Sequence, residues 1–173
     1  MQPSGNKINP PRYNTPEGRT HLSEELSYLW KVKRPQVTQA VAEAAAMGDR
    51  SENAEYIYGK KQLRQIDSRL RFLAKRLEEL VVVDRTPRDT SKIFFGAWVK
   101  LEDSGGNLFE YRIVGPDESN LKKGFISIDS PMAKALLRKT EGDEVVVSRP
   151  NGTDAFVVTS VSYEKQQQES GPE

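Results

Sequence analysis

The chain has 173 residues, enough for one large or two small domains, with 36% hydrophobic and 29% charged residues and a net charge of only +1. The absence of cysteine excludes disulfides, thiolate catalysis and cysteine-ligated zinc, and a single histidine, His21, excludes a histidine-based metal site or catalytic triad. Because no run approaches 18 apolar residues and no signal-peptide pattern is present, we expect a cytoplasmic protein without a membrane partner.

The first part of the chain changes from a polar segment to a helical pattern. Residues 1–14 are rich in Pro, Asn and Gly, which predicts a flexible lead-in. Thr15-Pro16-Glu17 then supplies a hydroxyl cap, a proline at the first helical position and an early acid, which together predict a helix start. Pro35 interrupts the apolar stripe that follows and predicts either a kink or a break into two helices.

A second helix is the clearest predicted element. Its apolar residues are spaced alternately three and four apart, as in a coiled-coil seam: Leu63, Ile66, Leu70, Leu73, Leu77 and Leu80. Folding the chain back at residues 48–52 places apolar residues of the two arms opposite each other. We therefore expect an antiparallel coiled-coil hairpin over residues 15–83, with arms about 45 Å long.

The C-terminal half has a strand-like pattern. Residues 84–91 are predicted to be a linker, and β-branched and aromatic runs predict strands at 93–101, 109–114, 125–128, 145–147 and 155–163. One short helix is predicted at 131–138. The predicted fold class is α+β, a helical hairpin followed by a small α+β domain over residues 92–165, with a disordered tail at 166–173.

The bend between the two helices carries two carboxylates, Asp49 and Glu52, at the most protruding point of the predicted hairpin. Their spacing also fits a capping box with Asp49 as the N-cap, and the two interpretations are compatible. Capping does not account for a third acid on the same face, Glu55, or for Tyr56 and Tyr58 so close to the bend. The residue types at the bend therefore leave a functional role open beside the capping role.

Two carboxylates about one turn apart suit Mg²⁺, which binds six oxygens and takes one or two carboxylates from a given protein. Asp49 and Glu52 alone make an incomplete site, so we expect them to bind Mg²⁺ only beside a partner that already holds metal and phosphates. In such a setting a second ion activates water for phosphodiester hydrolysis. No metal is expected to bind the isolated protein stably.

The second helix is strongly basic between Lys60 and Arg76, with seven basic residues against one acid, Asp67, a segment charge of +6. Lys31, Lys33 and Arg34 add positive charge from the facing arm. One interpretation is a solvated helix face, and the other is a stripe that follows a phosphate backbone. The residues proposed for RNA contact are Lys60, Lys61, Arg64, Arg69 and Arg71.

Five motifs in the same order resemble the bacterial transcript cleavage factors of the GreA/GreB family. The tip Met47-Gly-Asp-Arg-Ser-Glu-Asn-Ala-Glu-Tyr56 matches the family tip. The segments Tyr28-Leu-Trp30, Lys60–Asp67, Phe94–Val99 and Ile126–Leu137 are more similar to the GreB branch than to the GreA branch. The resemblance extends from about Thr15 to Tyr163.

The resemblance implies a coiled-coil hairpin and an FKBP-like domain that docks on RNA polymerase. The hairpin would enter the polymerase secondary channel, where Asp49 and Glu52 would help to hold the catalytic Mg²⁺ shared with the polymerase. The polymerase, and not this protein alone, would then cleave the backtracked 3′ end of the nascent RNA. A monomer is expected. Tip-shaping roles carry over to Arg50, Ser51, Asn53, Glu55 and Tyr56, and contact with the polymerase rim to Asp129, Ser130, Pro131 and Met132.

The chain departs from the family pattern in its longer lead-in, in the unfamiliar loop 115–124 and at Gly59, where a polar residue is common and glycine is expected to loosen the arm. Two other functions stay open. A binding protein of similar shape would occupy the channel and regulate the polymerase without stimulating cleavage. An FKBP-like prolyl isomerase would require an aromatic-lined pocket in the C-terminal domain.

Overall fold

The computed structural model describes residues 11–164. These residues form a helical unit over Glu17–Leu80 and a second unit that joins the described residues up to Pro16 with those from Val81 onward. The helical hairpin and the sheet domain confirm the predicted α+β class. Within residues 11–164 no helix is long and apolar enough to cross a membrane. The flexibility expected for residues 1–10 and the disorder expected for 166–173 lie outside the described residues.

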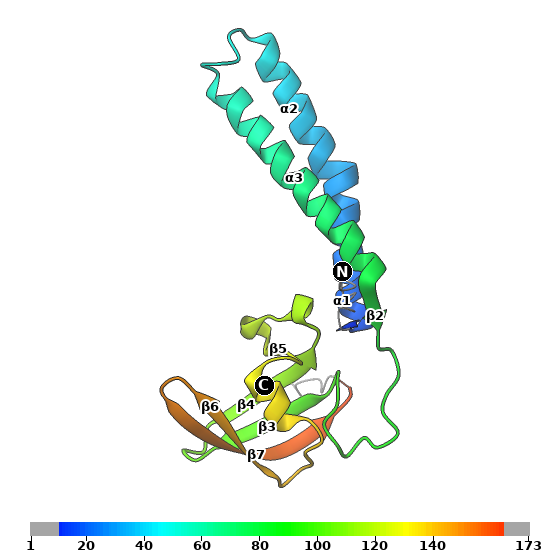
Figure 1. Cartoon of the computed structure of the whole chain (residues 1–173), viewed down its shortest axis with the longest axis vertical. Helices are drawn as coiled ribbons and strands as arrows, with labels where there is room; N and C mark the ends of the chain where they lie inside the picture. Colours follow the sequence, from blue (N-terminus) through cyan, green and yellow to red (C-terminus); the bar gives the residue numbers. More distant parts are fainter. Residues whose placement is uncertain (1–10, 165–173) are drawn as a thin grey trace, which may run out of the picture. The chain divides into compact units, whose positions relative to one another are not determined.

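The helical unit is an antiparallel hairpin. Its first arm runs through α1 (Pro16–Tyr28), the π-helical turn η1 (Leu29–Lys33) and α2 (Arg34–Ala46), and its second arm is the single helix α3 (Ala54–Glu79). The cartoon shows α2 and α3 lying side by side below the connecting loop (Figure 1). Both arms contribute buried residues to the hairpin. They are Leu22, Val37 and Ala44 in the first arm and Gly59, Ile66 and Leu73 in the second.

Pro35 does not divide the first arm into two helices. Helical backbone continues from Pro16 to Ala46, and the distortion takes the form of the π-helical turn directly before the proline. In this turn the Arg34 N–H donates to the Leu29 carbonyl, five residues back. Proline has no N–H for the carbonyl four residues before it, and a π turn changes the bonding pattern where that partner is missing.

Gly59 lies where the two arms approach each other closely. A Cβ atom at this position would lie 2.5 Å from Val41 Cγ2, so only glycine fits the present spacing. The residue expected to loosen the arm instead permits close helix packing, which compensates for the low helix propensity of glycine.

The second unit contains a five-stranded sheet in the order β5-β4-β3-β7-β6. Its strands are β3 (Trp98–Asp103), β4 (Leu108–Val114), β5 (Phe125–Ser127), β6 (Glu144–Arg149) and β7 (Gly152–Ser162). The β4–β5 pair is parallel and the other pairs are antiparallel. All five predicted strands are present, but the first begins at Trp98 rather than at Ile93. Residues 84–91 contain neither helix nor strand.

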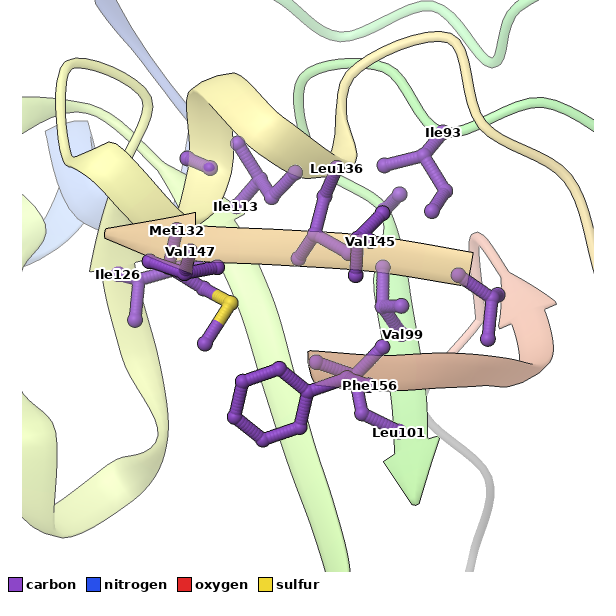
Figure 2. Close-up of a cluster of buried hydrophobic side chains, with 13 residues drawn as sticks. Ile93, Val99, Leu101, Ile113, Ile126, Met132, Leu136, Val145, Val147 and Phe156 are labelled. Atoms are coloured by element: carbon purple, nitrogen blue, oxygen red, sulfur yellow. The ribbon is translucent and has the colours of Figure 1, made fainter. Parts of the chain in front are cut away.

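One helix, α4 (Pro131–Leu136), contributes to the core of this sheet unit. It ends two residues before the predicted boundary, because Leu137 leaves the helical conformation with ψ of 132° and Arg138 then adopts a left-handed conformation with φ of 68°. Figure 2 shows Met132 and Leu136 of α4 among the buried side chains of the sheet. Met132 is only 8% exposed. The prediction that Met132 forms part of a docking surface is therefore wrong.

A short strand, β1 (Arg12–Asn14), corrects the prediction of a flexible lead-in over residues 12–14. It pairs with β2 (Leu80–Val82), and it also contacts the loop that leads from β4 to β5. In that loop lie the 3₁₀ turns η2 (Pro116–Glu118) and η3 (Leu121–Lys123). The Glu118 carboxylate accepts hydrogen bonds from the Thr15 N–H and the Gly115 N–H, both at 2.9 Å, and from the Thr15 hydroxyl. The unfamiliar loop thus holds the N-terminal strand.

Candidate functional site

The tip of the hairpin is a loop closed by Asn53. The chain leaves α2 at Met47, reverses at Gly48 with φ of 138°, and enters α3 after Asn53. The Asn53 side chain accepts from the Tyr56 N–H at 3.1 Å and donates to the Ala44 carbonyl at 2.8 Å. One amide therefore caps the start of α3 and bonds to the end of α2, which fixes the two ends of the loop to each other.

The predicted capping box is wrong, because Asn53 and not Asp49 is the N-cap of α3. The Asp49 carboxylate instead accepts from the Ser51 N–H at 2.8 Å and from the Ser51 hydroxyl at 2.7 Å. These hydrogen bonds, first from the hydroxyl and then from the backbone, lower the pKa of Asp49. Within residues 11–164 both bonds go to Oδ1, which leaves Oδ2 of this exposed carboxylate for an external ligand.

The remaining tip residues surround Asp49 without completing a metal site. Glu52 is exposed in the loop, and Glu55 is exposed in the first turn of α3. The Arg50 guanidinium lies 5.8 Å from the centre of the Tyr56 ring, which connects the loop to α3. No group of three His, Cys, Asp or Glu side chains among the described residues is arranged to hold a metal ion. The carboxylates suit a hard cation, but further ligands would have to come from another molecule.

The five basic residues of α3 that are predicted to contact RNA fall into two groups. Lys60, Lys61, Arg64 and Arg71 are exposed and form no salt bridge within the described part of the chain. Arg69 differs, because its guanidinium binds the Glu25 carboxylate through two hydrogen bonds of 2.7 and 2.9 Å and lies 5.1 Å from the Phe72 ring centre. The structure therefore leaves four of the five proposed RNA-contacting residues available and assigns Arg69 a contact between the arms.

The residues of the predicted docking segment, Asp129 to Met132, differ in their exposure to solvent. Ser130 is the N-cap of α4 and accepts from the Ala133 N–H at 3.2 Å, as the sequence predicts. Asp129 and Pro131 are exposed, whereas Met132 points into the core. Only the residues on the solvent side of the α4 start can meet a partner.

A separate pocket of about 450 Å³ lies on the sheet unit. Three aromatic residues line it, Phe109, Tyr111 and Phe156, together with the charged residues Asp103, Arg149 and Asp154. The Phe109 and Tyr111 rings are stacked with centres 6.3 Å apart, and Phe109 meets Phe156 edge-on at 5.8 Å. The pocket contains aromatic side chains of the kind that the isomerase alternative requires, but Phe156 is buried and most of the lining residues are polar or charged.

Sequence reasoning did not identify the role of Asn53 in joining the arms. A signal was available, since asparagine is among the preferred N-cap residues and directly precedes the helical pattern. The second bond of its side chain, to Ala44, depends on the return of the chain and has no local signal. The same holds for Glu118, whose partner Thr15 is 103 residues away in the sequence.

Two family profiles cover most of the chain. The profile described as "Transcription elongation factor, N-terminal" matches residues 12–82, and "Transcription elongation factor, GreA/GreB, C-term" matches residues 88–163. Transcription elongation factor GreB of Pseudomonas aeruginosa is 60% identical over 149 residues, covering 86% of this chain and 89% of that protein. GreB of Haemophilus influenzae is 57% identical over 153 residues, covering 88% and 97%.

A solved structure is also similar over most of its length. The crystal structure of GreA factor homolog 1 (Gfh1) of Thermus thermophilus is 24% identical, covers 88% of this chain and 99% of that chain, and aligns with a TM-score of 0.41. A score at this level supports no structural argument, so family membership is established by the sequence matches.

Proposed function

Because this chain belongs to the GreA/GreB family of transcription elongation factors, we propose that it stimulates RNA polymerase to cleave backtracked RNA. The hairpin would enter the secondary channel of the polymerase and present its tip to the polymerase active site. The observation that carries the proposal is the exposed Asp49 carboxylate, held by Ser51 on a loop that Asn53 fastens to both helices.

Asp49 and Glu52 are the residues that would contact the catalytic Mg²⁺. Bound there, Mg²⁺ would activate water and neutralise charge on the phosphate. The protein supplies a carboxylate that is already ionised and already oriented, because the Ser51 donors hold Oδ1 and lower the Asp49 pKa. The exposed Glu52 adds a second anionic oxygen donor. The presence of both acids favours cleavage stimulation over regulation without cleavage.

The test is an RNA cleavage assay on stalled, backtracked polymerase. Asp49→Asn should abolish stimulated cleavage while leaving polymerase binding nearly unchanged, because the amide oxygen still accepts from Ser51 but the charge that Mg²⁺ requires is lost. Glu52→Gln should act in the same direction with a smaller loss. Glu78→Gln, an exposed acid near the far end of α3, is the matched control. An Asp49→Asn variant that cleaves like the parent would refute the proposal.

A second assay separates stimulation from intrinsic nuclease activity. The polymerase-free protein should hydrolyse no RNA with or without Mg²⁺, since two exposed carboxylates cannot complete an octahedral site. RNA hydrolysis that persists after nuclease contamination is removed would contradict this assignment.

Prolyl isomerisation is a second candidate, favoured only by the aromatic-lined pocket of the sheet unit. A proline-containing tetrapeptide and the Tyr111→Ala variant test it. Isomerisation that the parent accelerates and the variant does not would establish this activity beside the first. An uncatalysed rate with the parent would exclude it.

A further inference from the structure

Trp30 is an exposed aromatic side chain on the shaft of the hairpin. It is 59% exposed and lies in the π-helical turn, and it is not among the residues buried between the two arms. An exposed aromatic ring beside basic residues is the arrangement on which bases of single-stranded nucleic acid stack. Trp30 precedes Asp49 by 19 residues, about 28 Å along a helix at 1.5 Å per residue.

The position of Trp30 is fixed by a chain of contacts to the other arm. The Arg34 guanidinium carbon lies 5.9 Å from the centre of the Trp30 ring, and Arg34 Nε lies 2.7 Å from the Asp67 Oδ1 atom of α3. The hydrogen bond from Arg34 lowers the pKa of Asp67, so this pair stays charged at neutral pH. The indole is therefore held at the seam between the arms by an anchored cation against its ring.

The contact of Arg34 with Asp67 places the Trp30 indole beside a row of exposed basic residues on α3. Arg64 and Arg71 lie three residues before and four residues after Asp67 on α3, and Lys60 lies four residues before Arg64. Residues at these spacings share one face of a helix. These three basic residues form no salt bridge among the described residues. Arg71 is nevertheless close enough to Asp67 to help lower the pKa of that carboxyl. Trp30 and three exposed basic residues without a salt bridge thus share one flank of the hairpin.

The opposite flank also carries an aromatic ring, but its surroundings differ. Phe72 is 39% exposed and contacts two guanidinium groups, Arg69 at 5.1 Å and Arg76 at 4.7 Å from its ring centre. Arg69 is neutralised by its two hydrogen bonds to Glu25. Arg76 is paired as well, since its Nη1 atom lies 3.9 Å from Glu79 Oε2. The Phe72 ring is less exposed than Trp30 and both neighbouring cations are already paired, so this flank is less suited to a polyanion.

We propose that Trp30 stacks on a base of single-stranded RNA whose phosphates bind Lys60, Arg64 and Arg71. The combination of a cationic row and an exposed aromatic ring is the general mode of sequence-tolerant single-strand binding, and stacking on one ring contributes about 1–3 kcal/mol per base. The inference rests on the proposed function, in which the strand is RNA extruded along the hairpin. Because Trp30 lies far from the tip, only long extruded strands reach it.

Fluorescence of the full-length protein tests the stacking directly. The chain has two tryptophans, so a Trp98→Phe background leaves Trp30 as the only indole. Two probes of equal length are titrated at low salt, a single-stranded RNA oligonucleotide and the same backbone without bases. The RNA should quench Trp30 emission and the abasic probe should not, because only a stacked base contacts the ring.

Affinity measurements give the second readout. Trp30→Leu should weaken binding of the base-containing RNA by about 5- to 150-fold and leave binding of the abasic probe unchanged. Trp30→Tyr keeps a ring and should retain most of the difference between the probes. Phe72→Leu on the opposite flank is the matched control and should change neither affinity. Thermal melts confirm that each variant is folded.

Three results would overturn the inference: no base-dependent quenching, equal losses in Trp30→Leu and Phe72→Leu, or a loss of polymerase binding in Trp30→Leu that is the same without extruded RNA. The last result would assign Trp30 to a contact with the protein wall of the channel. Because the oligonucleotide assays contain no polymerase, their outcome is independent of cleavage. Base-dependent quenching by a protein that fails to stimulate cleavage would refute the proposed function and leave this inference standing.

Discussion

At the scale of single residues, the tip depends on the two donors that Ser51 presents to Asp49. Both favour the ionised carboxylate, so Asp49 should stay ionised to a lower pH than in the unfolded chain. Ser51→Ala removes the hydroxyl donor but keeps the backbone N–H. We therefore predict that the Asp49 pKa rises in this variant and stays below the unfolded value.

A carboxyl ¹³C titration of the Asp49 side chain by NMR measures this change. Ser91→Ala is a useful control, because the Ser91 hydroxyl makes the equivalent bond to Asp89 outside the tip and its loss should leave the Asp49 titration unchanged. An Asp49 midpoint that is the same in Ser51→Ala and in the parent would show that the hydroxyl bond does not form in solution.

Part of the tip structure could be predicted from its residue types alone. The sequence correctly marks Asp49 and Glu52 as exposed acids in the bend, since acids between two amphipathic helices have no buried position to occupy. It misplaces the cap because Asp49 and Asn53 both precede a helical pattern. The choice between them depends on where the returning chain offers a partner, which for Asn53 is the Ala44 carbonyl.

At the scale of elements, the close packing at Gly59 leads us to predict that alanine at this helical position destabilises the hairpin, which is the reverse of the usual effect. Replacing a helical glycine with alanine normally stabilises by up to about 1 kcal/mol. Here the new Cβ would lie 2.5 Å from Val41 Cγ2, and valine has one strongly preferred rotamer in a helix. Overpacking of this kind costs about 1–3 kcal/mol, so Gly59→Ala should lower the free energy of unfolding of the hairpin.

Urea unfolding followed by circular dichroism provides the measurement, and Val41→Ala provides the matched background. In that background the clash is removed, so Gly59→Ala should become neutral or stabilising. If Gly59→Ala stabilises the hairpin with Val41 present, the arms are farther apart in solution than in the structure.

The elements differ in how well the sequence predicts them. The leucine seam of α3 has a period that only a helix satisfies, and the five strands are separated by turn residues, so these elements are present as expected. Strand β1 was missed because it has three residues and its pairing with β2 joins positions nearly 70 residues apart. The π-helical turn was missed because proline specifies the missing hydrogen bond but not how the preceding turn adjusts.

At the scale of the whole molecule, the two units have separate cores, and Met132 belongs to only one of them. Because Met132 is buried, Met132→Glu would place a carboxylate in the core and unfold the sheet unit instead of altering docking. The milder Met132→Ala should destabilise the sheet unit by about 2–5 kcal/mol and leave the hairpin unaffected.

Hydrogen exchange resolved by segment measures the two units separately. Protection in β3 and β7 should fall in Met132→Ala, whereas protection in α3 should not change. Leu121→Ala is the control, since Leu121 is 80% exposed and its loss should cost less than about 0.5 kcal/mol. An equal loss of protection in both units would show that they unfold as one.

Two units with separate cores also allow polymerase docking and tip chemistry to be separated. Asp129 is exposed at the start of α4, far along the chain from the tip, and is the charged member of the proposed docking segment. We predict that Asp129→Lys raises the protein concentration needed for half-maximal cleavage by at least about tenfold, as expected for reversal of an interface charge. The maximal cleavage rate at saturation should be unchanged, because Asp49 and Glu52 are intact.

Asp49→Asn should show the opposite pattern, with a normal half-maximal concentration for polymerase binding and little or no cleavage at saturation. Titrating both variants and the double variant against the same backtracked complex distinguishes the two effects. The double variant should combine the defects additively, since the residues lie in different units. A lowered maximal cleavage rate for Asp129→Lys at saturation would show that Asp129 also affects how the tip is positioned in the polymerase active site. An unchanged affinity for polymerase would place the docking surface elsewhere on the sheet unit.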